Sequence, residues 1–224
     1  MRLELLRPSR TALGAALPGL LLAFALTAPA AADEGHTART LKGSWAVGGR
    51  TVRIDLPPGR IAIEPSPDAR LTAELDVRCA FGNDCEERAA ELELETGREE
   101  SAFRLGVRGM PAVNTRGLSL RGRILVPRGA AVEIDMGAGE ISVRGVDGDL
   151  DVNVGAGEVS VRMPERAVRS VRMSVGIGEA SLAVAGRDIE SHGWLGHRVR
   201  WGDGSGRSRV NVSLGVGEAN VSVD

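Results

Sequence analysis

The 224-residue chain contains no tyrosine, and phenylalanine, tryptophan and histidine occur only three times each. Clefts that cleave glycans usually stack aromatic rings on the sugar, so this scarcity argues against a carbohydrate-cleaving enzyme. The sequence also lacks a Gly-x-Ser-x-Gly elbow, a His-Glu-x-x-His motif and a reactive cysteine. We therefore expect no enzyme, no catalytic residue and no cofactor, and leave a pair of carboxylates acting on a glycan as the alternative.

Strongly basic segments are missing as well. Residues 1–32 carry three arginines, then an apolar run, then small residues at Ala30 and Ala32, which is the pattern of a secretory signal peptide. Without this segment, 25 basic and 29 acidic residues leave a formal charge of about -4. This balance argues against nucleic acid or an anionic membrane surface as partner. No second apolar segment follows, so we expect an exported protein in the periplasm or at the cell surface, without membrane insertion.

Cysteine and histidine are too few to build an obvious metal centre. Cys79 and Cys85 flank a short loop, and in an exported protein this spacing predicts a disulfide, with a redox or metal pair as the alternative. His192 and His197 lie five residues apart with no third ligand near them in the sequence. We expect no metal site from them.

The sequence does contain apolar and polar residues that alternate almost without interruption from residue 132 onward. The alternation runs through VEIDM, EISVR and LDVNV, where the apolar positions are mainly β-branched. A period of two is typical of strands that bury one face. The sequence therefore predicts an all-β protein.

Four copies of Gly-x-Gly-Glu interrupt these strands. Their first glycines are separated by 18, 21 and 39 residues, the last interval being close to twice the others. A period of about 20 residues predicts a β-solenoid with a glycine pair at each corner, whereas an antiparallel meander is the alternative. The copies lack the third glycine or the lysine of a phosphate-binding loop. The residue between the glycines is always apolar, which predicts a side chain in the core: Ala138, Ala156, Ile177 and Val216.

The glutamate after each glycine pair predicts a column of like charges, because stacked turns bring equivalent residues to about 5 Å from one another. Such a column requires solvent, arginine partners or a bridging cation. One carboxylate per turn supplies few ligands for calcium, so we favour a solvated column over a cation site. The column would consist of Glu140, Glu158, Glu179 and Glu218.

Residues 43–131 keep the alternation but not the repeat, so more irregular strands are expected there than in residues 132–224. We expect residues 33–42 to be flexible and residues 43–224 to form a single domain. CEERAA predicts one or two helical turns. The polar segment 186–209 predicts an inserted loop, whose Trp194 and Trp201 either form an exposed ligand-binding platform or cover an end of the solenoid.

The segments VEIDMGAGEISVRGVDGDLDVNVGAGEVSV and VNVSLGVGEANVSVD resemble the bacterial putative-adhesin family. This resemblance implies an adhesin-like right-handed β-helix, related to the β-rich domains of cell-envelope stress proteins, and a place in the cell envelope. It brings no catalytic motif that could be transferred to this chain.

Polar residues that alternate with the core would form a ladder on one extended face: Asp135, Asn153, Ser174 and Ser213. Such a ladder predicts an adhesion-like, non-enzymatic module that binds an envelope glycan or protein. One alternative is an envelope stress-sensing or scaffold protein that self-associates or docks on a membrane partner. A carbohydrate-active β-helix enzyme is the second alternative.

Overall fold

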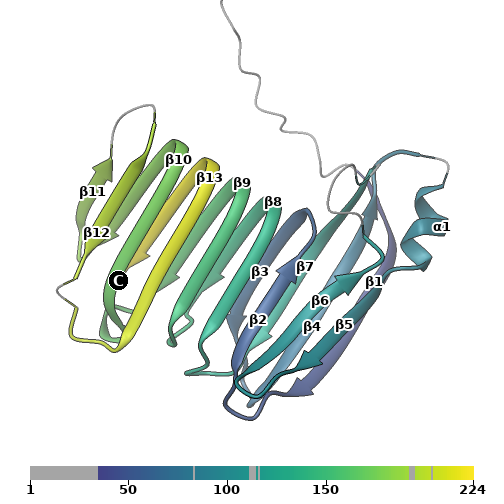
Figure 1. The fold of residues 1–224 in the computed structure, drawn as a ribbon, viewed down its shortest axis with the longest axis horizontal. Helices are drawn as coiled ribbons and strands as arrows, with labels where there is room; N and C mark the ends of the chain where they lie inside the picture. The colour runs from purple at the N-terminus through teal and green to yellow at the C-terminus, as the bar shows by residue number, and fades with distance from the viewer. Residues whose placement is uncertain (1–34, 83, 111–114, 116, 192–194, 203) are drawn as a thin grey trace, which may run out of the picture. The chain divides into compact units, whose positions relative to one another are not determined.

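The structure, a computed structural model, describes residues 35–224 except 83, 111–114, 116, 192–194 and 203. The described residues lie in one compact unit, Ala31–Asp224. Thirteen strands in this part of the chain form one large mixed sheet (Figure 1). The predicted all-β class is confirmed.

The signal-peptide prediction for residues 1–32 lies outside the described residues. From residue 35 onward, no described helix has the length and apolar character needed to cross a lipid bilayer.

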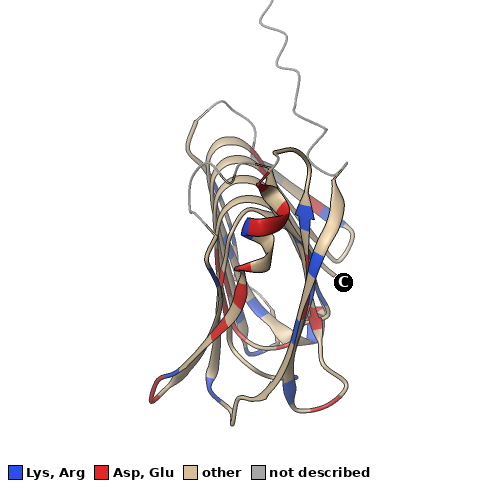
Figure 2. Cartoon of the chain, turned by 90° about the vertical axis from the view of Figure 1, so that its right-hand side faces the viewer, with Lys and Arg blue, Asp and Glu red and all other residues tan. Residues whose placement is uncertain are grey.

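Four long parallel strands form the centre of the sheet, and each bends at its Gly-x-Gly pair. The half of each strand before the bend belongs to one layer and the half after it to a second layer (Figure 2). Alternating apolar residues point between the layers, and their burial supplies most of the driving force for folding. In spatial order the four are β8 (Val132–Arg144), β9 (Leu150–Met163), β13 (Ser208–Val223) and β10 (Val168–Val184).

Shorter strands extend both layers. The first layer continues from β8 through β2 (Thr51–Leu56) and β6 (Ala102–Arg108) to β5 (Glu93–Arg98). The second continues from β8 through β3 (Gly59–Pro65), β7 (Leu118–Val126) and β4 (Arg70–Cys79) to β1 (His36–Ala46).

The order of the central strands departs from the sequential stacking of a simple solenoid. The fourth Gly-x-Gly copy, on β13, lies between the second copy on β9 and the third on β10. The described sheet also keeps free edges instead of closing into a tube. The structure therefore shows stacked, in-register copies without showing a complete β-helix.

The predicted inserted loop at 186–209 contains two strands. β11 (Arg187–Ser191) pairs antiparallel with the second half of β10, and β12 (His197–Trp201) pairs antiparallel with its first half. The segment thus covers the outer edge of β10 in both layers. Covering an exposed sheet edge is a common device against unwanted strand pairing.

The start of the domain also differs from expectation. Residues 36–42, expected to be flexible, form the first part of β1 and pair with β4. His36 hydrogen-bonds Glu86 at 3.0 Å. The pairing with β4 satisfies the backbone groups of this segment, and for that reason it is ordered.

The predicted helical turn and the predicted disulfide are both confirmed. Helix α1 spans Cys85–Ala90 and packs against β1 and β4, at the end of the sheet away from β11 and β12 (Figure 1). Cys79, at the end of β4, is bonded to Cys85, with their Cα atoms 5.9 Å apart. The disulfide therefore ties the helix to β4, which lies next to the edge strand β1 of the second layer. The one other helical element described is a 3-10 turn, η1 (Glu165–Ala167), which joins β9 to β10.

Candidate functional site

Two rows of glycine run across the central strands at the bend. The second glycine of each copy has φ between +128° and +136°, a region that side chains rarely adopt. A Cβ atom on Gly157 would also overlap the carbonyl oxygen of Gly139 in the neighbouring strand. A Cβ on the first glycine would likewise overlap a carbonyl oxygen of the neighbouring strand in three of the four copies. A Cβ on Gly137, the first glycine of the remaining copy, would have nothing within 4 Å. All of these glycines except Gly137 are therefore required by the bend or by close stacking.

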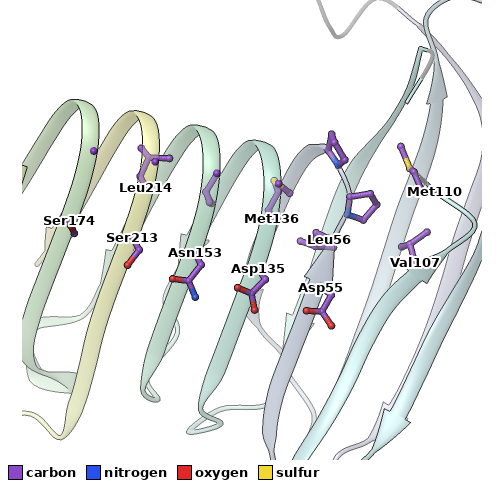
Figure 3. A pocket seen from close by; sticks show the side chains of 17 residues that line it. Asp55, Leu56, Val107, Met110, Asp135, Met136, Asn153, Ser174, Ser213 and Leu214 are labelled. Carbon is purple, nitrogen blue, oxygen red and sulfur yellow. The ribbon is translucent and has the colours of Figure 1, made fainter. Parts of the chain in front are cut away.

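A row of polar side chains lies two residues before the first glycines. Pairing places Asp135 opposite Asn153, Asn153 opposite Ser213, and Ser213 opposite Ser174, as predicted for the ladder. All four are exposed. Asp55 on β2 pairs with Asp135 and extends the row by one strand (Figure 3). At the usual strand spacing the five residues, here called the polar row, span about 20 Å.

The polar row and the first glycines line an open groove of about 770 Å³. Its floor is glycine backbone, because Gly137, Gly155, Gly215 and Gly176 carry no side chains there. Pro57 and Pro58 continue the floor on the connection between β2 and β3, and Val107 and Met110 lie at that end (Figure 3). The groove is thus elongated across strands instead of being a deep pocket.

The polar row has free hydrogen-bonding capacity. Among the described residues, the side chains of Asp135, Ser213 and Ser174 make no hydrogen bond or ion pair with another residue. Asn153 donates to Asp151 at 3.1 Å, and Asp55 is paired with Arg104 at 2.6 Å. Three of the five members can therefore bind a ligand without losing an internal contact.

The apolar residues between the glycines are outside the core, which corrects the prediction made from their character. Ile177 is 51% exposed and Val216 is 48% exposed. Ala156 is exposed and Ala138 is half-buried. The prediction was wrong because the chain turns at the bend, so the alternation that places Met136 and Ile141 in the core does not continue through the glycine pair.

These four residues instead form an apolar ridge beside the groove. Ala138 pairs with Ala156, Ala156 with Val216, and Val216 with Ile177. Gly196 donates its backbone N–H to the carbonyl oxygen of Gly176 at 2.8 Å, which places Leu195, 76% exposed, next to this end of the ridge. The ridge thus adjoins the first glycines of the groove without being part of the groove's lining.

The predicted glutamate column lies beyond the ridge, in the second layer. The strand register places Glu140 beside Glu158, Glu158 beside Glu218, and Glu218 beside Glu179. Arg60 stands in line with the column and pairs with Glu140 at 2.6 Å. Glu218 accepts a hydrogen bond from Asn220, whereas Glu158 and Glu179 have no partner among the described residues. The column is solvent-exposed except at Glu140, which is half-buried.

The other predicted site residues lie elsewhere. Trp194 and His192 fall outside the described residues. Trp201 is half-buried on β12 and packs against the hydrophobic core, an arrangement that covers the edge of β10. His197 is buried on the same strand. No cluster of three or more His, Cys, Asp and Glu side chains that could hold a metal ion occurs among the residues described.

Sequence reasoning missed the part of the site on β2 and β3. IDLPPGRIAI aligns in space with IDMGAGEISV, so Leu56 pairs with Met136 and Gly59 with Gly139. The equivalence is hidden in the sequence because the Gly-x-Gly pattern is absent from Pro-Pro-Gly. The flanking Ile-Asp and the single shared glycine were the available signal.

Two putative adhesion proteins are among the solved structures that the chain resembles. A putative cell adhesion protein from Clostridium sporogenes has 15% sequence identity, with 83% of this chain and 100% of that chain covered and a TM-score of 0.48. A putative adhesin from Bacteroides fragilis has 12% identity, with 82% and 97% covered and a TM-score of 0.22. No protein-family model and no curated protein matches the chain. At these identities and TM-scores, neither likeness defines the function of this chain.

Proposed function

We propose that this chain is an exported, non-enzymatic, adhesion-like module of the bacterial cell envelope that binds an extended polymer along the groove. The observation that carries the proposal is the polar row, which lies in register across five neighbouring strands beside a glycine floor. A repeating arrangement of equivalent side chains suits a ligand that itself repeats. A single small molecule would use only one or two members of the row.

The chemistry of the groove favours a linear glycan. Carboxylate, amide and hydroxyl groups of the polar row can hydrogen-bond sugar hydroxyls. The bare glycine floor permits close approach, and the apolar ridge offers a surface for the apolar face of a sugar ring. The family resemblance of the sequence and the disulfide between Cys79 and Cys85 support export and an envelope location. The adhesin-like β-helix is part of the same proposal, with the glycine bends as its corners.

The proposal is tested by binding to purified peptidoglycan sacculi in a co-sedimentation assay and to an array of soluble linear polysaccharides. Because the polar row repeats, removal of one small side chain leaves equivalent contacts in place. The informative change is therefore the double variant Asn153→Arg, Ser213→Arg, which fills the middle of the groove at two exposed, adjacent positions. We expect at least about a tenfold loss of affinity, the effect of losing about 1.4 kcal/mol of binding free energy.

The matched control is Ser160→Arg, Asn220→Arg. These residues are an adjacent pair on the same two strands, in the second layer and away from the groove. We expect the control to bind as the wild type does. Equal binding by the groove variant and the wild type would reject the groove as the site. Absence of wild-type binding to sacculi and to every polysaccharide would reject the glycan as the ligand.

A further inference from the structure

The position of β13 is unexpected for the chain order, because it lies between two strands that both precede it. β13 is parallel to β9 and to β10, and its Leu214 pairs with Val154 on one side and Val175 on the other. β9 and β10 thus form the two walls of a slot one strand wide. β13, which fills the slot, follows both β9 and β10 in the sequence.

The slot is framed by residues other than those of β13. Pro164 and η1 connect β9 to β10 across the slot that β13 occupies. This distance is about 10 Å, or two strand spacings. The backbone N–H of Glu165 donates to the carbonyl oxygen of Asp224 at 2.8 Å, and that of Asp224 donates to Met163 at 3.2 Å. The connection therefore contacts the far end of whichever strand occupies the slot.

The segment that leads into β13 is short and rich in glycine and serine. Residues 202–207, between β12 and β13 in the sequence, read GDGSGR, and β12 and β13 pair with opposite sides of β10. Described members of this segment are held to the start of β10 by backbone hydrogen bonds, including Gly204 to Arg169 at 3.1 Å and Gly206 to Val168 at 3.2 Å. A glycine-rich connection of this kind can adopt a second course at modest cost.

The contacts that hold β13 do not depend on which chain supplies it. Its inward side chains are buried between the layers: Val210, Val212, Leu214, Ala219, Val221 and Val223. Each has a counterpart at the same register in β9 and β10. A β13 strand from a second copy would make the same backbone ladder, the same core contacts and the same stacking of glycines.

From these observations we infer that β13 exchanges between two copies of this protein, each copy inserting its β13 into the slot between β9 and β10 of the other. The product is a closed two-fold dimer, since both slots are filled and no partner surface is left over. All contacts of β13 are kept, and only the connection between β12 and β13 differs. Exchange requires β13 to leave the core, so it is slow in the folded protein and favoured by refolding at high concentration.

The test is a pair of cysteines placed across the slot wall. Ser160 on β9 and Asn220 on β13 are opposite each other and half-exposed. In the double variant Ser160→Cys, Asn220→Cys, oxidation joins β9 to β13, since paired strands bring Cα atoms within the range of a disulfide. The link lies within one chain in the monomer and between two chains in the exchanged dimer. After refolding at increasing protein concentration, denaturing gels without reductant are expected to show a rising share of covalent dimer.

The matched control is Ser142→Cys, Ser160→Cys, which joins β8 to β9 at the same height of the sheet. These strands do not exchange under the proposal, so only cross-linked monomer is expected at the concentrations that give dimer in the first variant. Wild-type protein refolded under the same conditions should show twice the monomer mass by light scattering. Monomer alone in all samples, or equal dimer in both cysteine variants, would overturn the inference. The ligand-binding test is independent of this outcome.

Discussion

Asp149, in the turn before β9, holds Arg209 on β13 through its side chain and through its backbone. The guanidinium donates to one carboxylate oxygen at 2.8 Å, and the backbone N–H of Arg209 donates to the other, also at 2.8 Å. Burial is the largest single influence on the carboxyl and favours its neutral form, but the hydrogen bonds and the charge of Arg209 together outweigh it. The pKa of Asp149 is consequently lower than usual, and folding favours its ionised form.

Asp149→Asn is therefore expected to destabilise the protein in a pH-dependent way. A carboxyl whose pKa is lowered by folding stabilises the fold above its unfolded pKa, about 3.9, and this stabilisation disappears as the pH falls through the folded pKa. Because the pair is partly exposed, we expect a loss of about 0.5 kcal/mol near neutrality. Urea unfolding at neutral pH and at about pH 2 measures it. The control Asp135→Asn changes a carboxyl without partners among the described residues and should have little effect. An undiminished loss at the lower pH would contradict the ion-pair explanation.

Gly157→Ala should be far more harmful than Gly137→Ala. Gly157 has φ of +136°, and a Cβ there would overlap a backbone oxygen of the neighbouring strand. Left-handed strain and the forced separation of two strands together should lower the free energy of unfolding by at least about 3 kcal/mol. Gly137 begins the same row of bends, but a Cβ would have open space, so its variant should lose less than about 1 kcal/mol. Thermal unfolding of the two variants makes the comparison. Similar losses of unfolding free energy in both variants would show that close contact with the neighbouring strand is not the reason why glycine is needed.

Glu158→Gln should stabilise the fold slightly. Glu158 lies between Glu140 and Glu218 in neighbouring strands, and like charges directly opposite each other in a sheet are unfavourable. We expect a gain of about 0.3 kcal/mol at low ionic strength that diminishes with added sodium chloride. Glu165→Gln, outside the column, is the control. Calcium titration of the wild type provides the second measurement, since a stoichiometric uptake that Glu158→Gln abolishes would establish a cation column in place of a solvated one.

Loss of the disulfide should destabilise the end of the sheet beside α1. Cys79 and Cys85 are six residues apart, and closing so short a loop contributes about 2 kcal/mol in the chain-entropy account. The double variant Cys79→Ala, Cys85→Ala should therefore unfold at lower urea concentration. Reductant should lower the wild-type midpoint by a similar amount and leave the variant unchanged. A wild-type midpoint that is insensitive to reductant would argue against a stabilising bond.

Local patterns predicted much of this protein. Alternation identified the strands of residues 132–224, the acidic start of α1 was visible after Cys85, and the outward direction of Asp135 and Asn153 followed from period two. The same rule failed at Ile177, because a bend between two glycines interrupts the alternation on which it depends. It also failed to connect IDLPPG with IDMGAG, since a bend can be built from proline as well as from glycine.

The sequence by itself determined the all-β class, the bends and the equivalence of the four Gly-x-Gly-Glu copies, because period, glycine and β-branching act over a few residues. Only the tertiary structure decided their spatial order. Near-identical strands offer the same register to one another, so local preference does not distinguish β9–β10–β13 from β9–β13–β10. The distinction comes from contacts distant in the chain, such as η1 spanning the slot and Asp149 holding Arg209. The pairing of β2 with β8, also distant in the chain, brings Asp55 into line with Asp135 and so completes the groove.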